Sequence, residues 1–154
     1  MNHLTNISIV PLLADRIVLC AAGQTKEKVL SQLVKLICRA VPSLDASSLQ
    51  KQLLQREQTM STTLDTGLSI PHIRVDEVEQ VTAALAILPE ALPDTNGKQI
   101  KAMFLFLSPN RPAFFQQHLQ LLAHLAETFT PELLTRLSCL VTTQEVLEEL
   151  GKKQ

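Results

Sequence analysis

Aromatic side chains are scarce in this sequence, which has no tryptophan, no tyrosine and five phenylalanines among its 154 residues. Proteins that bind single-stranded nucleic acid stack bases on aromatic rings, and proteins that bind duplexes carry clustered positive charge. Here 14 Lys and Arg residues are scattered among 15 Asp and Glu residues, which gives a formal net charge of -1. We therefore expect no nucleic acid among the partners of this chain.

Long apolar runs are missing as well. The longest, residues 81–88 and 102–107, are too short to span a bilayer, and the first residues lack the charged and apolar regions of a signal peptide. We therefore expect no membrane insertion and a cytoplasmic location. The three cysteines, Cys20, Cys38 and Cys139, lie far apart, which predicts buried free thiols rather than a disulfide framework or a metal site.

Glycine is also rare, and the four glycines stand singly. Neither G-x-x-x-x-G-K-[ST] nor G-x-G-x-x-G occurs, so the Gly-rich loops that hold nucleotide phosphates are absent. His118 and His124 are six residues apart, which is not the H-E-x-x-H spacing of two zinc ligands on one helix face. No G-x-S-x-G sequence provides an activated serine. We expect neither a metal nor a small cofactor.

The apolar residues that are present follow helical spacing in some segments and form short β-rich runs in others. The predicted strands are residues 17–20, a strand ending at His72, and residues 81–88 and 102–107; residues 4–12 fit a short strand or a helical turn, and residues 89–97 a loop. The predicted helices are residues 25–39, a helix from Asp45 or Ser47 to Arg56, and helices at about 113–129, 131–140 and 142–150. Strands mixed with such helices predict an α/β sheet with helices on both faces. The length fits a single domain over residues 1–154, with its core at about residues 4–150.

The residues from Arg56 to His72 carry the candidate chemistry. Pro71 fixes its own φ and restricts the residue before it, so the backbone direction at His72 is limited before any packing. A neutral imidazole is a competent nucleophile, and Arg56 with the hydroxyls of Ser61 and Thr62 suits a phosphate-like anion. Two interpretations fit these residues equally: a phosphate-handling site, or a strand end at His72 beside a solvated helix end at Arg56.

A second histidine lies on the predicted helix at residues 113–129. His118, Leu121 and Leu125 recur at helical spacing on the apolar, inward face, whereas His124 belongs to the polar, outward stripe. If the strand at residues 102–107 lies beside the one ending at His72, two imidazoles and a helix N-terminus converge. His118 is then able to hydrogen-bond a phosphate held on His72.

These elements together resemble a known family. The order R-E, S-T, G-x-x-I-P-H and H-L-x-L-L-x-x-L-A, with the opening V-P-L-L-A-D-R-I-V-L, is similar to the fructose/mannitol-type enzyme IIA domains of the bacterial phosphoenolpyruvate-dependent sugar phosphotransferase system. The resemblance covers nearly the whole chain and is strongest to the stand-alone, nitrogen-regulatory branch.

The resemblance implies a three-layer α/β fold with a mixed sheet and a specific set of roles. His72 would accept a phosphoryl group from a histidine-containing phosphocarrier protein, with His118 as the supporting histidine and Arg56 near the phosphate. In that family the recipient is a sugar-transporter IIB domain, or, in the nitrogen branch, the phosphorylation state is reported to regulatory target proteins. An alternative is a regulatory binding module that keeps this fold and has lost efficient phosphoryl transfer.

Three positions depart from the family pattern and motivate that alternative. Thr63 and Asp65 stand where the family usually has glycine, and Ile73 follows the P-H pair where it commonly has a small residue. Asp65 is expected to place a negative charge near the phosphate unless it points away, and Thr63 to change the shape of the loop. Ile73 is expected to narrow the access of a partner.

Overall fold

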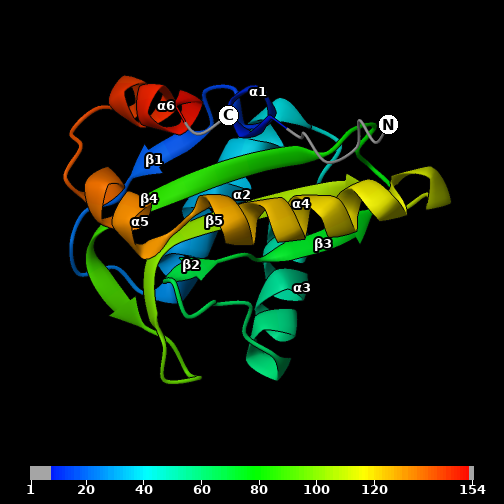
Figure 1. Ribbon diagram of the computed structural model, residues 1–154. Helices are drawn as coiled ribbons and strands as arrows, with labels where there is room; N and C mark the ends of the chain where they lie inside the picture. Colours follow the sequence, from blue (N-terminus) through cyan, green and yellow to red (C-terminus); the bar gives the residue numbers. More distant parts are fainter. Residues whose placement is uncertain (1–7, 153–154) are drawn as a thin grey trace.

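A mixed five-stranded β-sheet runs through the middle of the computed structural model, which describes residues 8–152 (Figure 1). Its strand order is β1-β4-β5-β2, and β3 also pairs with β5. Strands β4 and β5 are antiparallel, and the other three pairings are parallel. The strands are β1 (Ile17–Leu19), β2 (Leu68–Ser69), β3 (His72–Val75), β4 (Thr82–Pro93) and β5 (Gln99–Pro109).

Helices cover both faces of this sheet, as the sequence predicts. One hydrophobic cluster joins the sheet to α1 (Ile9–Leu13), α4 (Phe115–Thr128), α5 (Pro131–Ser138) and α6 (Thr143–Gly151). A second joins the opposite face to α2 (Lys26–Ala40) and α3 (Ala46–Thr59). In Figure 1, α4 and α5 lie in front of the sheet and α2 behind it. The arrangement is the three-layer α/β fold with a mixed sheet.

Strand β5 shows why its sequence is a near-continuous apolar run. Phe104 and Phe106 pack into the cluster with α4, whereas Met103, Leu105 and Leu107 pack into the cluster with α2 and α3. A strand buried on both faces needs apolar residues at every position. The parallel pairing of β5 with the edge strand β3 then sets which way each side chain of β3 faces.

Most predicted helices are confirmed, with small differences at their ends. Thr25 caps α2 by accepting a hydrogen bond from the amide of Lys28, and Thr142 caps α6 in a reciprocal pair with Glu145. Residues 9–13 are helical, while residues 4–7 of that prediction lie outside the described residues. The helix expected from residue 113 begins as the 3-10 turn η2 (Pro112–Phe114), and α4 follows from Phe115.

Three sequence-based predictions were wrong. Residues 89–93, expected in a loop, continue β4 as a two-stranded ribbon with β5 beyond an irregularity between Ile87 and Leu92, where prolines are tolerated. His72 begins β3 instead of ending a strand, because Pro71 has no amide proton for the ladder and separates β2 from β3. The third error concerns Cys139, a free thiol that is exposed rather than buried because it lies at the C-cap of α5.

No helix in residues 8–152 has both the length and the apolar character needed to cross a bilayer. All three cysteines are free, with Cys20 buried and Cys38 partly buried.

Candidate active site

The side chain of His72 stands at the start of the edge strand β3, directly opposite Phe106 of β5 in the parallel pairing. Its Nδ1 atom lies 2.6 Å from the carbonyl oxygen of Ile70. A carbonyl oxygen only accepts hydrogen bonds, so Nδ1 carries the proton and Nε2 keeps the lone pair. The side chain is only partly buried, which leaves Nε2 as the ring nitrogen available to react.

Two other rings fix the orientation of this imidazole. Phe106 stacks on His72, with ring centroids 5.3 Å apart and planes at 12°. His118 of α4 meets His72 edge-on, with centroids 5.2 Å apart and planes at 63°, and it meets Phe106 in the same way at 5.0 Å. The predicted convergence of the two histidines is therefore present, with Phe106 as a shared packing surface.

His118 is almost completely buried, with 5% of its surface exposed. Its Nδ1 lies 2.5 Å from the hydroxyl oxygen of Ser108, a fully buried residue near the end of β5. Among the described residues, Nε2 is therefore the ring nitrogen of His118 that makes no hydrogen bond, as it is in His72. His124, six residues along the same helix, belongs to neither of these contacts and is partly exposed, as its phase predicts.

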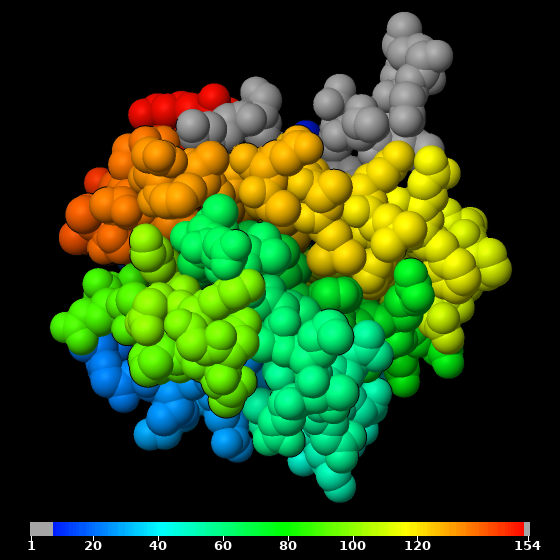
Figure 2. Space-filling view, turned by 60° about the horizontal axis from the view of Figure 1, so that its bottom comes forward, coloured from blue at the N-terminus to red at the C-terminus, as the bar shows by residue number. Residues whose placement is uncertain are grey.

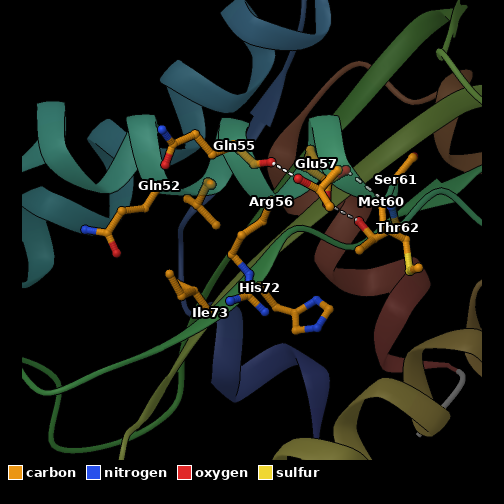
Figure 3. A pocket seen from close by; sticks show the side chains of 11 residues that line it. Gln52, Gln55, Arg56, Glu57, Met60, Ser61, Thr62, His72 and Ile73 are labelled. Carbon is orange, nitrogen blue, oxygen red and sulfur yellow. Dashed lines mark hydrogen bonds between the residues drawn. The ribbon is translucent and has the colours of Figure 1, made fainter.

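A cleft of about 630 Å³ opens beside His72, between the last turns of α3 and the start of β3. Figure 3 shows the Arg56 side chain reaching from α3 so that its guanidinium group lies beside the His72 ring. In the space-filling view, the cyan-green surface of α3 lies at the bottom of the molecule and the yellow beginning of α4 at its right (Figure 2). The residues that line the cleft around His72 are Arg56, Glu57, Met60, Ser61, Thr62 and Ile73.

The electrostatics of the pair favour neutral imidazoles. Burial lowers the pKa of His72, and the cations Arg56 and Arg74 act in the same direction, against the opposing effects of the Ile70 carbonyl and Glu57. Burial, reinforced by His72, Arg74 and Arg56, lowers the pKa of His118 to about 4. Both rings are therefore uncharged near neutral pH, which leaves His72 with the lone pair that a nucleophile needs.

The hydroxyl groups of Ser61 and Thr62, predicted to bind phosphate, both donate to carboxylates. Thr62 donates to Glu57 at 2.7 Å, and Ser61 donates to Asp94 at 2.5 Å. Both residues line the cleft, but an anion that takes these protons has to compete with Glu57 and Asp94. Their role in phosphate binding stays a prediction.

Sequence reasoning missed a buried polar cluster beneath the cleft. Asp94, with a fully buried side chain, accepts hydrogen bonds from Ser61 and Thr63, each at 2.5 Å, and from Lys26 at 3.0 and 3.1 Å. Lys26 also pairs with Glu57 at 3.0 Å. Burial on its own raises the pKa of Asp94, but the hydrogen bonds outweigh it and hold that pKa well below its usual range. The only sequence signal for Asp94 was the D-T-N-G turn at residues 94–97, and a turn signal does not identify hydrogen-bond partners more than 30 residues away in the sequence.

Arg74 is the second residue that the sequence reasoning missed. It lies on β3, two residues after His72, and its guanidinium carbon lies 4.5 Å from the centre of the Phe115 ring at the start of α4. This cation–π contact brings a second positive charge to the edge of the site. The sequence signal that could have identified Arg74 is the alternation of side chains along a strand, because residues two apart, such as His72 and Arg74, share a face.

Of the three residues that depart from the family pattern, Ile73 lines the cleft, whereas Thr63 and Asp65 do not. Thr63 is buried, and its hydroxyl joins the cluster around Asp94. The Asp65 carboxylate is 93% exposed and pairs with Lys98 at 3.2 Å, so it points away from the cleft. The side chain of Ile73 packs against α2 and α3 and also lines the cleft, so its effect on the access of a partner stays a prediction. Among residues 8–152, no group of three His, Cys, Asp or Glu side chains is arranged to hold a metal ion.

Residues 11–153 match the model of one protein family, described as the phosphoenolpyruvate-dependent sugar phosphotransferase system, EIIA 2. The chain belongs to this family. The match confirms the resemblance inferred from the R-E, P-H and H-L-x-L-L elements and agrees with the three-layer fold.

Members with known names come from two branches of this enzyme IIA family. The chain is 31% identical over 106 residues to the nitrogen regulatory protein of Pseudomonas aeruginosa, which is 68% of each chain. It is 30% identical over 132 residues to the fructose-specific EIIA component of Haloferax volcanii, covering 82% of this chain and 84% of that protein. The crystal structure of nitrogen regulatory protein IIA-Ntr from Neisseria meningitidis superimposes with a TM-score of 0.79 at 28% identity, covering 92% and 98% of the two chains.

Proposed function

We propose that this enzyme IIA family member is a phosphocarrier that accepts a phosphoryl group on Nε2 of His72. The donor is a histidine-containing phosphocarrier protein, and the phosphorylation state of His72 is what partner proteins read. The observation that carries this proposal is the hydrogen bond between Nδ1 of His72 and the carbonyl of Ile70. It directs the reactive lone pair to Nε2 on a ring that borders an open cleft.

The transfer forms one bond and breaks one bond. The lone pair on Nε2 of neutral His72 attacks the phosphorus atom, and the phosphorus–nitrogen bond of the donor phosphohistidine breaks. Its electron pair returns to the donor ring, which leaves as a neutral imidazole if its second nitrogen is protonated. The phosphorylated ring of His72 then carries a positive charge, and the Ile70 carbonyl stabilises it through Nδ1–H.

Stabilisation of the transferring group falls to Arg56 and His118. The guanidinium group of Arg56 beside the His72 ring supplies donors to the phosphoryl oxygens (Figure 3). His118 supplies one hydrogen bond from a buried position, where it is stronger than in water. Catalysis of this kind depends on positioning and charge rather than on a bound cofactor.

The test is phosphorylation by the general phosphotransferase components with phosphoenolpyruvate, read by mass spectrometry at alkaline pH because phosphohistidine is lost in acid. We expect one phosphoryl group on the wild-type chain and none on His72→Ala. The matched control is His124→Ala, which removes a histidine of α4 outside the ring cluster and should label normally. Labelling that persists in His72→Ala would overturn the assignment.

The recipient is a regulatory target protein or a transporter IIB domain, and the first is preferred because two of the matches are nitrogen regulatory proteins. Incubation of the labelled chain with purified IIB domains distinguishes the two, since a sugar-transport role requires the label to leave His72. A binding module without transfer predicts no labelling at all. The outward-pointing Asp65 carboxylate removes one reason for that alternative.

A further inference from the structure

The hydroxyl group of Ser108 is a buried donor that the roles above leave unused. Ser108 has no exposed surface, and among the described residues its hydroxyl oxygen has one hydrogen-bond partner, Nδ1 of His118 at 2.5 Å. It lies on β5 opposite Arg74, two residues beyond the Phe106 ring that packs on both histidines. The contact is therefore buried at both ends, since Ser108 has no exposed surface and His118 has 5% of its surface exposed.

The direction of this hydrogen bond decides which nitrogen of His118 carries the proton. A serine hydroxyl can donate or accept, whereas a neutral imidazole has one donor nitrogen and one acceptor nitrogen. If His118 donated from Nδ1, the hydroxyl proton of Ser108 would have no acceptor in its buried surroundings. An unmade buried donor costs about 1–3 kcal/mol. If Ser108 donates, its proton is satisfied and Nε2 of His118 carries the ring proton.

Resting on the phosphocarrier function proposed above, we infer that Ser108 is a positioning residue which donates to Nδ1 of His118 and holds it in the Nε2–H tautomer. This tautomer presents a hydrogen-bond donor to an oxygen of a phosphoryl group on His72. The other tautomer presents a lone pair, which repels that oxygen. The low pKa of His118 makes the tautomer matter, because the ring carries a single proton near neutral pH.

The first readout is the tautomer itself. Long-range ¹H–¹⁵N correlation spectra of the unphosphorylated chain at pH 7.5 distinguish a protonated ring nitrogen from an unprotonated one. We expect an unprotonated Nδ1 and a protonated Nε2 for His118 in the wild type and in Ser108→Thr, which keeps the hydroxyl. Ser108→Ala should shift the ring toward the Nδ1–H tautomer or a mixture. A wild-type spectrum with Nδ1–H on His118 would overturn the inference.

The second readout is the rate of phosphorylation of His72 by its donor. We expect Ser108→Ala to slow it about tenfold, equivalent to about 1.4 kcal/mol of transition-state stabilisation, and Ser108→Thr to restore most of it. The matched control is Ser69→Ala, which removes a fully buried serine hydroxyl of the same sheet that has no partner in the described part of the chain. It should leave both readouts unchanged.

The outcomes separate the two proposals. If the wild-type chain takes up no phosphoryl group, the phosphocarrier function fails and so does the purpose assigned to Ser108. If His72 is labelled but Ser108→Ala changes neither the tautomer nor the rate, the inference about Ser108 fails alone. A rate loss equal in Ser108→Ala and Ser69→Ala would also refute it, since it would reflect only the loss of a buried hydroxyl.

Discussion

Phe106 stacks flat on His72, with centroids 5.3 Å apart, and meets His118 in a T-shaped arrangement, with centroids 5.0 Å apart and planes at 62°. One fully buried side chain of β5 therefore fixes the angle between the two imidazoles. Aromatic contacts of this kind add about 0.5–1.5 kcal/mol beyond the burial of area, and they restrict ring rotation.

Replacing Phe106 with leucine should affect both stability and transfer. We expect Phe106→Leu to lower the free energy of unfolding by about 1–2 kcal/mol, because a buried ring is lost and the leucine fills the space only in part. It should also slow phosphorylation, because the His72 ring loses its stacking surface. Phe104→Leu is the matched control, since Phe104 is equally buried on the same face of β5 but is paired with Phe106 and Phe129 rather than with either histidine. A similar slowing in both variants would contradict a specific role for Phe106.

Loss of the Arg56 charge should slow transfer with little effect on stability. Arg56 is exposed at the end of α3, so we expect Arg56→Gln to change the free energy of unfolding by less than about 0.5 kcal/mol. Removing a charged donor to the phosphoryl oxygens should slow phosphorylation about tenfold to hundredfold. Arg56→Lys should recover part of the rate, because it restores the charge but not the planar fork. Arg39→Gln, at the end of α2, is the control, and an unchanged rate in Arg56→Gln would argue against this role.

The Asp94 cluster should dominate the stability of the loop that borders the cleft. We expect Asp94→Asn to lower the free energy of unfolding by about 2–4 kcal/mol at pH 7, because Lys26 loses a buried partner and the Ser61 and Thr63 hydroxyls lose a charged acceptor. Amide hydrogen exchange should accelerate across residues 61–67. The exposed pair between Asp65 and Lys98 gives the control, since Asp65→Asn should cost less than about 0.5 kcal/mol. Equal effects of the two substitutions in chemical denaturation would refute this assignment.

Stability should fall in mild acid because of the buried histidine. The pKa of His118 is about 4 in the folded chain and about 6.5 when unfolded, so between these values the unfolded chain binds more protons. The full contribution of neutral His118 is present above about pH 6.5 and is lost as pH falls toward 4, by up to about 3 kcal/mol. The lowered pKa of His72 acts in the same direction. The stability that the lowered pKa of Asp94 contributes is fully present above the unfolded pKa of 3.8 and is lost only as the pH falls below that value.

Urea unfolding at pH 7 and pH 4.5 measures this effect. His118→Gln removes the titrating group and keeps a polar side chain, so the difference between the two pH values should shrink in that variant. A pH dependence as large in His118→Gln as in the wild type would assign the loss to other groups. His124→Gln, with the same chemical change at a partly exposed position, should behave as the wild type.

The two histidines could be predicted from sequence because each is tied to a local pattern. Pro71 restricts the backbone just before His72, and the spacing of the apolar residues in α4 places His118 on the buried face of that helix. Asp94 and Ser108 could not be found in this way, because their partners are brought to them only by the folded sheet. A turn signal identifies Asp94 as a turn residue, and Ser108 directly follows the apolar run at residues 102–107, where the sequence pattern predicts a loop. Neither pattern encodes the carboxylate–hydroxyl or hydroxyl–imidazole contact that each residue makes.

Strand pairing also decides whether the rings of His72 and His118 meet. His72 faces α4 only because β3 pairs with β5 so that His72 lies opposite Phe106 and Arg74 opposite Ser108. A shift of the β3–β5 register by one residue would turn the imidazole of His72 toward α3 and would place the Ile73 side chain where that imidazole now lies. The loop at residues 60–67 can therefore vary, as it does at Thr63 and Asp65, without changing the direction of the His72 ring. Substitutions that weaken the β3–β5 ladder should inactivate the chain even when every side chain of the site is intact.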